Sequence, residues 1–231
     1  MIPSWLTWLS TAMLVVGLLS AAEIAVDISV RGYRQPMRIM EAVWPVTGLY
    51  FGPAASWAYR SFGRPKSPQW QHERGLRGPQ PEPDWAPVAL GVTHCGAGCT
   101  LGDIIAEFAV FGVGATVAGE PLYAEYAGDY LAALGLGIAF QYLAIASMRN
   151  LSVRAGLSTA AKADVLSLTS FEVGLFDWMG LVYFVLWPAP HHLTPSAPTY
   201  WFLMQVGMVI GYFTAWPTNV WLIRRGIKEG M

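Results

Sequence analysis

Residues 86–114 read APVALGVTHCGAGCTLGDIIAEFAVFGVG, and this stretch decides the fold. It is apolar along most of its length and contains no Lys or Arg. A helix needs about 20 mostly apolar residues to cross the roughly 30 Å hydrocarbon core of a bilayer. The stretch therefore predicts a membrane-spanning helix. It is an unusual one, because it also carries His94, Asp103 and Glu107.

The composition of the whole chain agrees with a membrane protein. Hydrophobic residues make up 54% of the 231 residues, and charged residues make up 13%, about half the usual share of a soluble domain. The mean hydropathy is +0.40. The net charge of −1 gives no sign of a nucleic-acid or acidic partner, and two cysteines are too few for a secreted disulfide scaffold.

Five further apolar stretches predict membrane spans, at residues 3–27, 40–60, 125–148, 163–187 and 200–223. The second of these contains two prolines, Pro45 and Pro53, so we expect it to be kinked. Residues 61–85 are rich in Pro, Gly and charge, which indicates a polar loop. We therefore predict an all-α, polytopic transmembrane bundle of about six spans, forming a single domain over residues 1–231.

The Lys and Arg residues predict that both termini lie in the cytoplasm. In that orientation eleven of them fall in inner loops and three in outer loops, as the positive-inside rule favours. The three exceptions are Arg31, Arg34 and Arg38, for which we expect a position at the interface, against lipid phosphates. Two small-residue pairs, Gly98-x-x-x-Gly102 and Gly207-x-x-x-Gly211, predict close packing between helices.

The HCGAGC segment predicts a metal site within the membrane. Cys95, Cys99, Asp103 and Glu107 are spaced four apart, so on a helix they form one slowly drifting stripe, and His94 lies about 100° around from Cys95. Soft thiolates suit Cu(I) or Zn(II), and an imidazole and a carboxylate can complete a zinc shell. The predicted metal ligands are therefore His94, Cys95, Cys99 and Asp103, with copper or zinc as the metal.

Two other interpretations of these residues stay open. They can be small polar side chains that are satisfied within a packed bundle. Alternatively, Cys95 and Cys99 can form a disulfide, although the i,i+4 spacing on a regular helix is too wide and the turn at Gly96 and Gly98 would have to unwind.

Further polar and sulfur-containing side chains in the spans extend this prediction to a pathway. Ionisable groups within a span are costly and commonly mark a route, a relay or a site. The candidate pathway residues are Glu107, Glu172, Asp177, Met204 and Met208.

Four segments resemble the bacterial membrane family known as domain of unknown function 4396. They are residues 41–65 (EAVWPVTGLYFGPAASWAYRSFGRP), 93–103 (THCGAGCTLGD), 140–180 and 200–231, which ends in WLIRRGIKEGM. The resemblance extends over most of the chain from Met37 onward. It implies a multi-pass protein of the bacterial inner (plasma) membrane and carries no assigned activity. Similar domains stand beside multicopper oxidase modules in some chains, so the resemblance favours copper and suggests a multicopper oxidase or another membrane subunit as a partner.

Taken together, these observations predict a multi-pass membrane protein that binds or transports a soft metal ion, with copper favoured. Its expected partners are the lipid bilayer and the metal ion, and no enzymatic activity is assigned. One alternative is an intramembrane thiol/disulfide oxidoreductase, against which stands the lack of a second cysteine pair to pass electrons on. Another is a non-catalytic subunit of a larger membrane complex.

Overall fold

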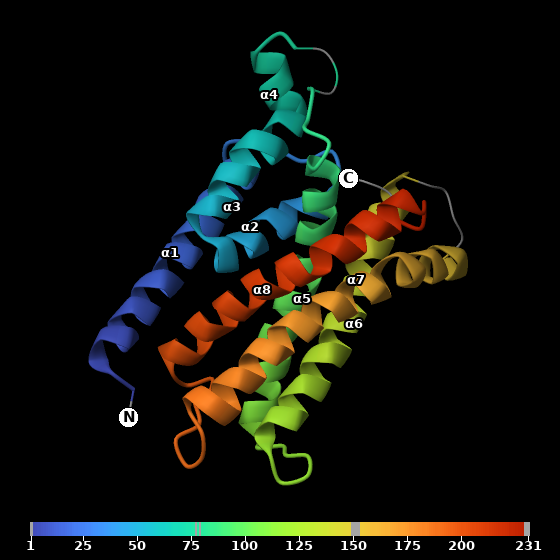
Figure 1. Cartoon of the computed structure of the whole chain (residues 1–231). Coiled ribbons are helices and arrows are strands. Elements are labelled where there is room, and N and C mark those ends of the chain that lie inside the picture. Colours follow the sequence, from blue (N-terminus) through green and yellow to red (C-terminus); the bar gives the residue numbers. More distant parts are fainter. Residues whose placement is uncertain (1, 77, 79, 149–152, 229–231) are drawn as a thin grey trace.

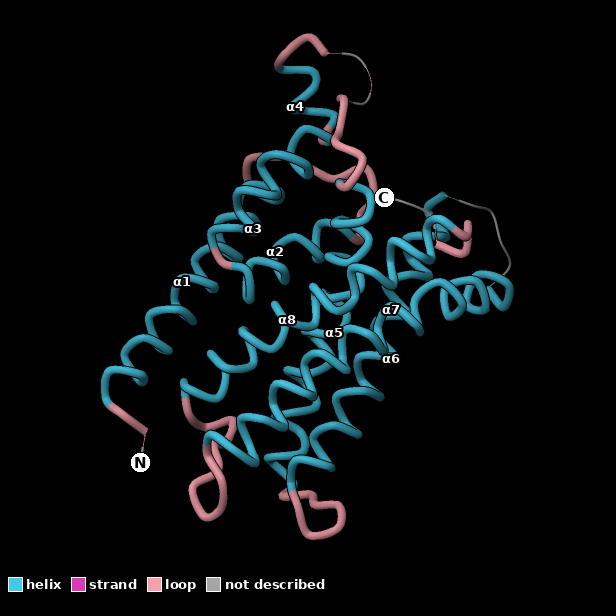
Figure 2. Tube along the Cα trace, in the orientation of Figure 1, coloured by secondary structure: helices cyan, strands magenta, loops and turns pink. Residues whose placement is uncertain are grey.

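The computed structural model describes residues 2–76, 78, 80–148 and 153–228. Helix accounts for 79% of the structure, and the described residues contain no strand (Figure 2). The elements in chain order are α1 (Ser4–Ser29), α2 (Met40–Phe51), α3 (Pro53–Ala58), η1 (Tyr59–Gly63), η2 (Arg64–Lys66), α4 (Pro68–Glu73), α5 (Ala86–Val113), α6 (Pro121–Met148), α7 (Val153–Leu181), η3 (Val182–Leu186) and α8 (Pro198–Arg224). The prediction of an all-α fold is confirmed.

Four long helices, α5 to α8, form the main bundle (Figure 1). α5 packs against α6, α6 against α7, and α7 against α8, while α5 also contacts α7 and α8 and so closes the bundle. Successive helices run antiparallel because the loops at residues 114–120 and 187–197 turn back at the same end (Figure 1). α1 and α2 pack on the outside, against α8 and α5.

Small residues bring these helices into direct backbone contact. A side chain at Gly102 would collide with the backbone of Ala133 on α6, and one at Gly98 would lie 3.0 Å from Cα of Gly137. On α8, a side chain at Gly211 would lie 2.7 Å from the carbonyl oxygen of Phe171. The close packing predicted for the two small-residue pairs is therefore confirmed.

The segment predicted as one kinked span over residues 40–60 is instead a helical hairpin. α2 ends at Phe51, Gly52 adopts φ 54° and ψ −129°, and α3 starts at Pro53. Residues with a side chain rarely adopt such a positive φ, and proline lacks the amide hydrogen that would continue α2. The break at these two residues reverses the chain, so this segment forms two short helices instead of the single kinked helix predicted.

Contacts with α1 fix the depth of this hairpin. The turn at Gly52 lies beside Val16, near the middle of α1. The hydroxyl of Tyr59, after the return, donates a hydrogen bond of 2.9 Å to Asp27 near the end of α1. Both arms of the hairpin therefore open toward the end of the bundle where α1 ends, and the tip reaches about half-way along α1 (Figure 1).

As a result, α1 begins and α8 ends at opposite ends of the bundle (Figure 1). The hydroxyl of Ser10 lies 3.5 Å from that of Thr199 at the start of α8. The amine of Lys228, just after α8, lies 3.3 Å from the carbonyl oxygen of Gly91, near the start of α5. The prediction that both termini lie in the cytoplasm rests on residues 40–60 forming one span, which the hairpin does not match; the side on which each terminus lies stays a prediction.

Three helical stretches of the described part are long and apolar enough to cross a membrane: Ser4–Ser29, Ala86–Val113 and Asp164–Leu186. They support membrane association, as the composition indicates. The count of about six spans stays a prediction.

Candidate functional site

The ionisable stripe of α5 faces the interior of the bundle. The helix continues without interruption through the HCGAGC segment. Cys95, Cys99 and Asp103 are fully buried, and Glu107 is 2% exposed. The predicted stripe of four side chains one turn apart is therefore present, and it points away from the surface.

The two cysteines lie beside the tip of the α2–α3 hairpin. Both are free thiols. A side chain at Gly96 would meet the hydroxyl of Tyr50, from the end of α2, at 3.0 Å and the ring of Phe171 at 2.9 Å. Because α5 remains helical here, the thiols keep the wide i,i+4 separation that disfavours a disulfide.

His94 points to a different neighbourhood from the thiols. Its ring packs edge-on against Phe140 of α6, with ring centroids 6.2 Å apart, and its charged neighbours are Asp164 and Lys228. Among the described residues, no three His, Cys, Asp or Glu side chains are grouped in a way that could hold a metal ion. The structure thus places the predicted ligand His94 apart from the other three.

Five carboxyl groups and one tyrosine gather in the half of the bundle where α5 ends. We call these residues the acidic cluster: Asp103 and Glu107 of α5, Glu125 and Asp129 of α6, Glu172 of α7 and Tyr200 of α8. Each member is at most 8% exposed. Each also interacts electrostatically with at least one other member. Four helices therefore converge on one buried acidic region.

Much of the hydrogen-bonding capacity of the acidic cluster is unused. Both carboxyl oxygens of Asp103 have no hydrogen-bond partner among the described residues. Glu172 lies beside the thiol of Cys99, and the hydroxyl of Tyr200 lies beside Glu107, but neither contact has hydrogen-bond geometry. None of the ion pairs in the described part of the chain involves the cluster. Since a buried ionised carboxylate without a partner is costly, these groups need a proton or a cation to balance their charge.

Two of the predicted pathway carboxylates, Glu107 and Glu172, belong to this cluster, and the third does not. Asp177 lies on an exposed part of α7. It follows Glu172 by five residues and is therefore turned by about 140° around the helix.

The two predicted methionines, Met204 and Met208, are buried on α8, at 1% and 3% exposure. The hydroxyl of Thr100 donates to the sulfur of Met208 at 3.6 Å. This contact places Met208 against α5 one residue after Cys99.

The sequence prediction missed the contribution of α6. Glu125 and Asp129 lay at the start of a predicted span and were not assigned to the pathway. Their spacing of four residues repeats that of Asp103 and Glu107, which puts both pairs on single helix faces. This repeated spacing was the signal that could have identified them.

At the other end of α5, a buried ion pair joins the C-terminal segment to α7. The amine of Lys228 lies 3.3 Å from Oδ1 of Asp164, and the two side chains are 0% and 1% exposed. The predicted spans at residues 163–187 and 200–223 place Asp164 at a span end and Lys228 in a loop, so the sequence does not predict the burial of this pair.

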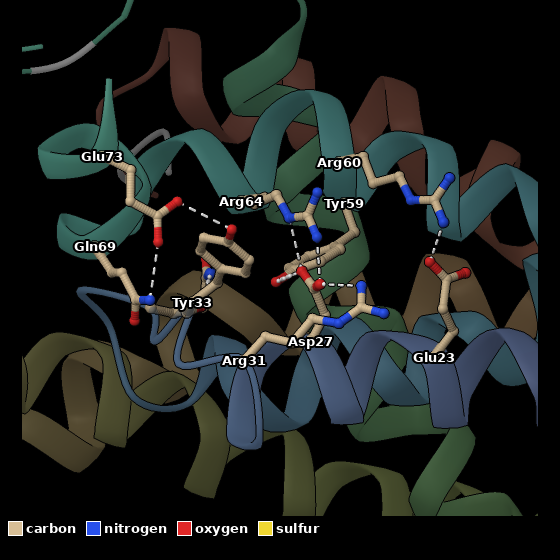
Figure 3. Close-up of polar contacts among 10 residues, drawn as sticks. Glu23, Asp27, Arg31, Tyr33, Tyr59, Arg60, Arg64, Gln69 and Glu73 are labelled. Carbon is tan, nitrogen blue, oxygen red and sulfur yellow. Dashed lines mark hydrogen bonds and ion pairs between the residues drawn. The ribbon is translucent and has the colours of Figure 1, made fainter. Parts of the chain in front are cut away.

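A separate polar network fastens α1 to the returning arm of the hairpin and to α4 (Figure 3). Asp27 is its centre and accepts hydrogen bonds from Tyr59 at 2.9 Å, from Nε of Arg64 at 2.8 Å and from Arg31 at 3.1 Å. The bond to Asp27 raises the pKa of Arg64, which holds the guanidinium in its charged form. The hairpin is thus bound to the end of α1 by charge as well as by packing.

The outer contacts of this network are more exposed. Arg60 pairs with Glu23, the hydroxyl of Tyr33 donates to Glu73 at 3.1 Å, and the amide of Gln69 donates to the same carboxylate at 3.0 Å (Figure 3). The contact of Tyr33 ties the loop after α1 to α4, and the pair of Arg60 with Glu23 adds a second link between α1 and the returning arm.

Comparison with known proteins identifies one family. Residues 84–228 match the family described as domain of unknown function, DUF4396. No curated protein and no solved structure matches the chain. The match covers α5 to α8 and ends at Lys228, so it includes the cysteine pair, the acidic cluster and the buried ion pair. It begins later than Met37, from which the resemblance was expected to extend, and leaves α1 to α4 outside. Because the match covers more than half of the sequence, the chain belongs to the DUF4396 family.

Proposed function

We propose that this chain moves a cation across a membrane along the buried face of α5, with a soft metal ion as cargo and copper favoured. The observation that carries the proposal is the acidic cluster, in which five buried carboxyl groups face one another without a basic partner among the described residues. Intramembrane carboxylates in this situation are characteristic of ion routes and relays.

The cysteine pair supports a soft ion. Two thiolates select Cu(I) by softness, and Cu(I) is stable with only two sulfur ligands. Zinc is the weaker candidate, because its sites usually have four ligands and His94 lies apart from the thiols. From Cys95 to Glu107 is twelve residues, about 18 Å along the helix, so an ion bound at the thiols has carboxylates at each later turn.

The distribution of basic residues supports an orientation for this route. Arg77 and Arg149 lie outside the described residues. The other twelve of the 14 Lys and Arg residues lie toward the end of the bundle where α1 and α8 end. By the positive-inside rule this end faces the cytoplasm. The hairpin accounts for Arg31, Arg34 and Arg38, because it keeps the loop after α1 on this same side.

We therefore propose that the chain crosses the bacterial plasma membrane with α1, α5, α6, α7 and α8, while α2 and α3 enter and leave on the cytoplasmic side. In this orientation the N-terminus is outside, the C-terminus is inside, and the acidic cluster lies toward the outer face.

Reconstitution into liposomes tests the function. Vesicles that contain an entrapped Cu(I) chelator should take up Cu(I) when they carry the wild-type protein. Uptake should fall to the level of empty vesicles with Cys95→Ser/Cys99→Ser and with Asp103→Asn. Asp177→Asn is the matched control, because that carboxylate is exposed and outside the acidic cluster. Equal uptake by all four proteins would refute transport along this face.

The acidic cluster favours a second candidate, proton transfer, because buried carboxyl groups exchange protons readily when a neighbouring carboxyl is within reach. An entrapped pH indicator distinguishes the two. Proton flux that depends on Asp103 but not on the cysteines would favour a proton route over a metal route.

A further inference from the structure

The side chain of Lys228 fills the space beside the start of α5, at the cytoplasmic end of the ionisable stripe in the proposed orientation. Gly226 adopts φ 66° after the end of α8, and the chain turns back, with the amide of Lys228 donating to the carbonyl oxygen of Leu222 at 3.3 Å. This turn directs a fully buried lysine side chain between α5 and α7. A lysine is almost never fully buried unless something compensates its charge.

The ammonium group has two partners, and both are oxygens at long range. It lies 3.3 Å from Oδ1 of Asp164 and 3.3 Å from the carbonyl oxygen of Gly91. Charge-assisted N–H···O bonds are commonly about 2.7–2.9 Å. The lysine therefore fills this position without forming tight bonds.

Further acceptors around the ammonium group are unused. Oδ2 of Asp164 and Oδ1 of Asn219 have no hydrogen-bond partner among the described residues, and both are buried. The amide nitrogen of Asn219 donates to Ser167 at 2.7 Å and to Ala215 at 2.9 Å, which leaves its oxygen free. A Cβ atom added at Gly91 would lie 3.7 Å from Oδ1 of Asn219 and 3.8 Å from Cε of Lys228. The amide oxygen and the lysine side chain therefore lie in the same small region.

We propose that Asp164, Asn219 and the carbonyl of Gly91 form a binding site for a monovalent cation such as K⁺ or ammonium, and that Lys228 is a tethered occupant which competes with it. A site made of oxygens alone suits a hard cation, whereas the thiols of the cysteine pair are what select Cu(I). The site is therefore distinct from the cysteine pair. The existence of this cation site does not depend on the proposed transport. Its role does, because we assign it to hold an ion that couples to that transport at the cytoplasmic end.

The exchange keeps the buried charge balanced. When the cation binds, Lys228 withdraws to the cytoplasmic surface, a short distance because it lies just beyond α8. When the cation leaves, the ammonium group returns and Asp164 is not left as an unpaired buried charge, which would be strongly destabilising. The role of the segment WLIRRGIKEGM is then to supply Lys228, which pairs with Asp164 whenever no cation occupies the site.

The test uses the purified full-length protein and the variant Lys228→Met, which keeps an apolar side chain in the space of the lysine stem. Unfolding midpoints are measured in KCl, NaCl, ammonium chloride and choline chloride at equal ionic strength. The wild type should be equally stable in all four salts. The variant should gain about 3–6 °C in KCl or ammonium chloride over choline chloride, at a concentration ten times Kd.

Two further proteins control this result. Lys228→Met/Asp164→Asn should lose the gain, because the carboxylate is removed. Arg225→Ala alters an exposed basic residue of the same segment and should behave as the wild type. If Lys228→Met does not fold, Lys228→Ala is measured with ethylammonium chloride, whose cation replaces the missing ammonium group.

Equal stability of the lysine variant in every salt would overturn the cation site, and so would a gain that persists without Asp164. Neither outcome depends on copper uptake. A variant stabilised by K⁺ in a protein that moves no copper would keep this site and remove only the proposed transport.

Discussion

Asp27 and Arg64 are joined by two hydrogen bonds, from Nε at 2.8 Å and from one terminal nitrogen of the guanidinium. The two residues lie 37 positions apart in the sequence. Asp27 is near the end of α1, and Arg64 follows the α2–α3 hairpin. Bidentate pairing of this kind fixes orientation as well as distance. The pair therefore holds the returning arm of the hairpin at the level of the end of α1 (Figure 3).

Removing the charge of Asp27 should loosen this attachment. We expect Asp27→Asn to lower the free energy of unfolding by about 1–3 kcal/mol, because a carboxylate that is 3% exposed loses its pairing with Arg64. The measurement is equilibrium unfolding in detergent. Glu23→Gln removes the more exposed pair with Arg60 and should cost less than about 1 kcal/mol. An equal cost for both variants would show that Asp27 is not the centre of the network.

A side chain at Gly102 should disrupt the contact between α5 and α6. Gly102→Ala places a methyl group against the backbone of Ala133, which cannot move as a flexible side chain can. We expect a loss of about 1–3 kcal/mol in unfolding free energy, as in other overpacked interiors. Gly112→Ala on the same helix meets no atom within 4 Å and should be neutral or stabilising by up to about 1 kcal/mol. If the two variants are equally stable, the close contact seen between the helices is incorrect.

Asp103→Asn should weaken metal binding without unfolding the protein. The amide keeps an acceptor and adds donors, so the packing tolerates it, but the charge that attracts a cation is removed. We expect Cu(I) affinity, measured by competition with a chelator, to fall by roughly 10-to-100-fold. Thiol titration of Cys95 and Cys99 with and without Cu(I) reports whether the ion sits on the sulfurs. Unchanged affinity in a folded Asp103→Asn protein would leave this carboxylate with a structural role.

The five-crossing orientation predicts which introduced cysteines are reached from outside the cell. An impermeant thiol reagent should label Ser4→Cys and Ser196→Cys in intact cells, and should label Arg74→Cys only after lysis. All three positions are exposed, and the native cysteines are buried. Labelling of Arg74→Cys in intact cells, or protection of Ser4→Cys, would rule out this orientation.

Features that depend on spacing along one helix could be predicted from the sequence. The stripe of Cys95, Cys99 and Asp103 follows from the four-residue repeat, and the close packing at Gly98 and Gly102 follows from small residues one turn apart. Both depend on local helix geometry, which a long apolar stretch already establishes.

Features that depend on several helices could not be predicted in this way. The direction of the chain after Gly52 depends on where α1 offers contacts, and hydropathy alone reads residues 40–60 as one crossing. His94 lies only about 100° from Cys95, yet the neighbours on its side are Phe140 and Asp164. The pairing of Lys228 with Asp164 joins positions 64 residues apart, and charge patterns assign both to the surface.

The half-depth hairpin also determines what the lipids touch. Its arms fill the half of the space beside α1 that lies toward the end of that helix, and next to Leu49, close to the tip, a cavity of about 340 Å³ lies between α1, α5 and α8. Leu14, Thr100 and Met208 are among the residues that line it. In the orientation proposed above, this space would face the outer leaflet, and acyl chains would fill it in place of a further helix. A lipid tail in this cavity would lie next to Thr100, the residue after Cys99, and would make the outer leaflet part of the surroundings of the cysteine pair.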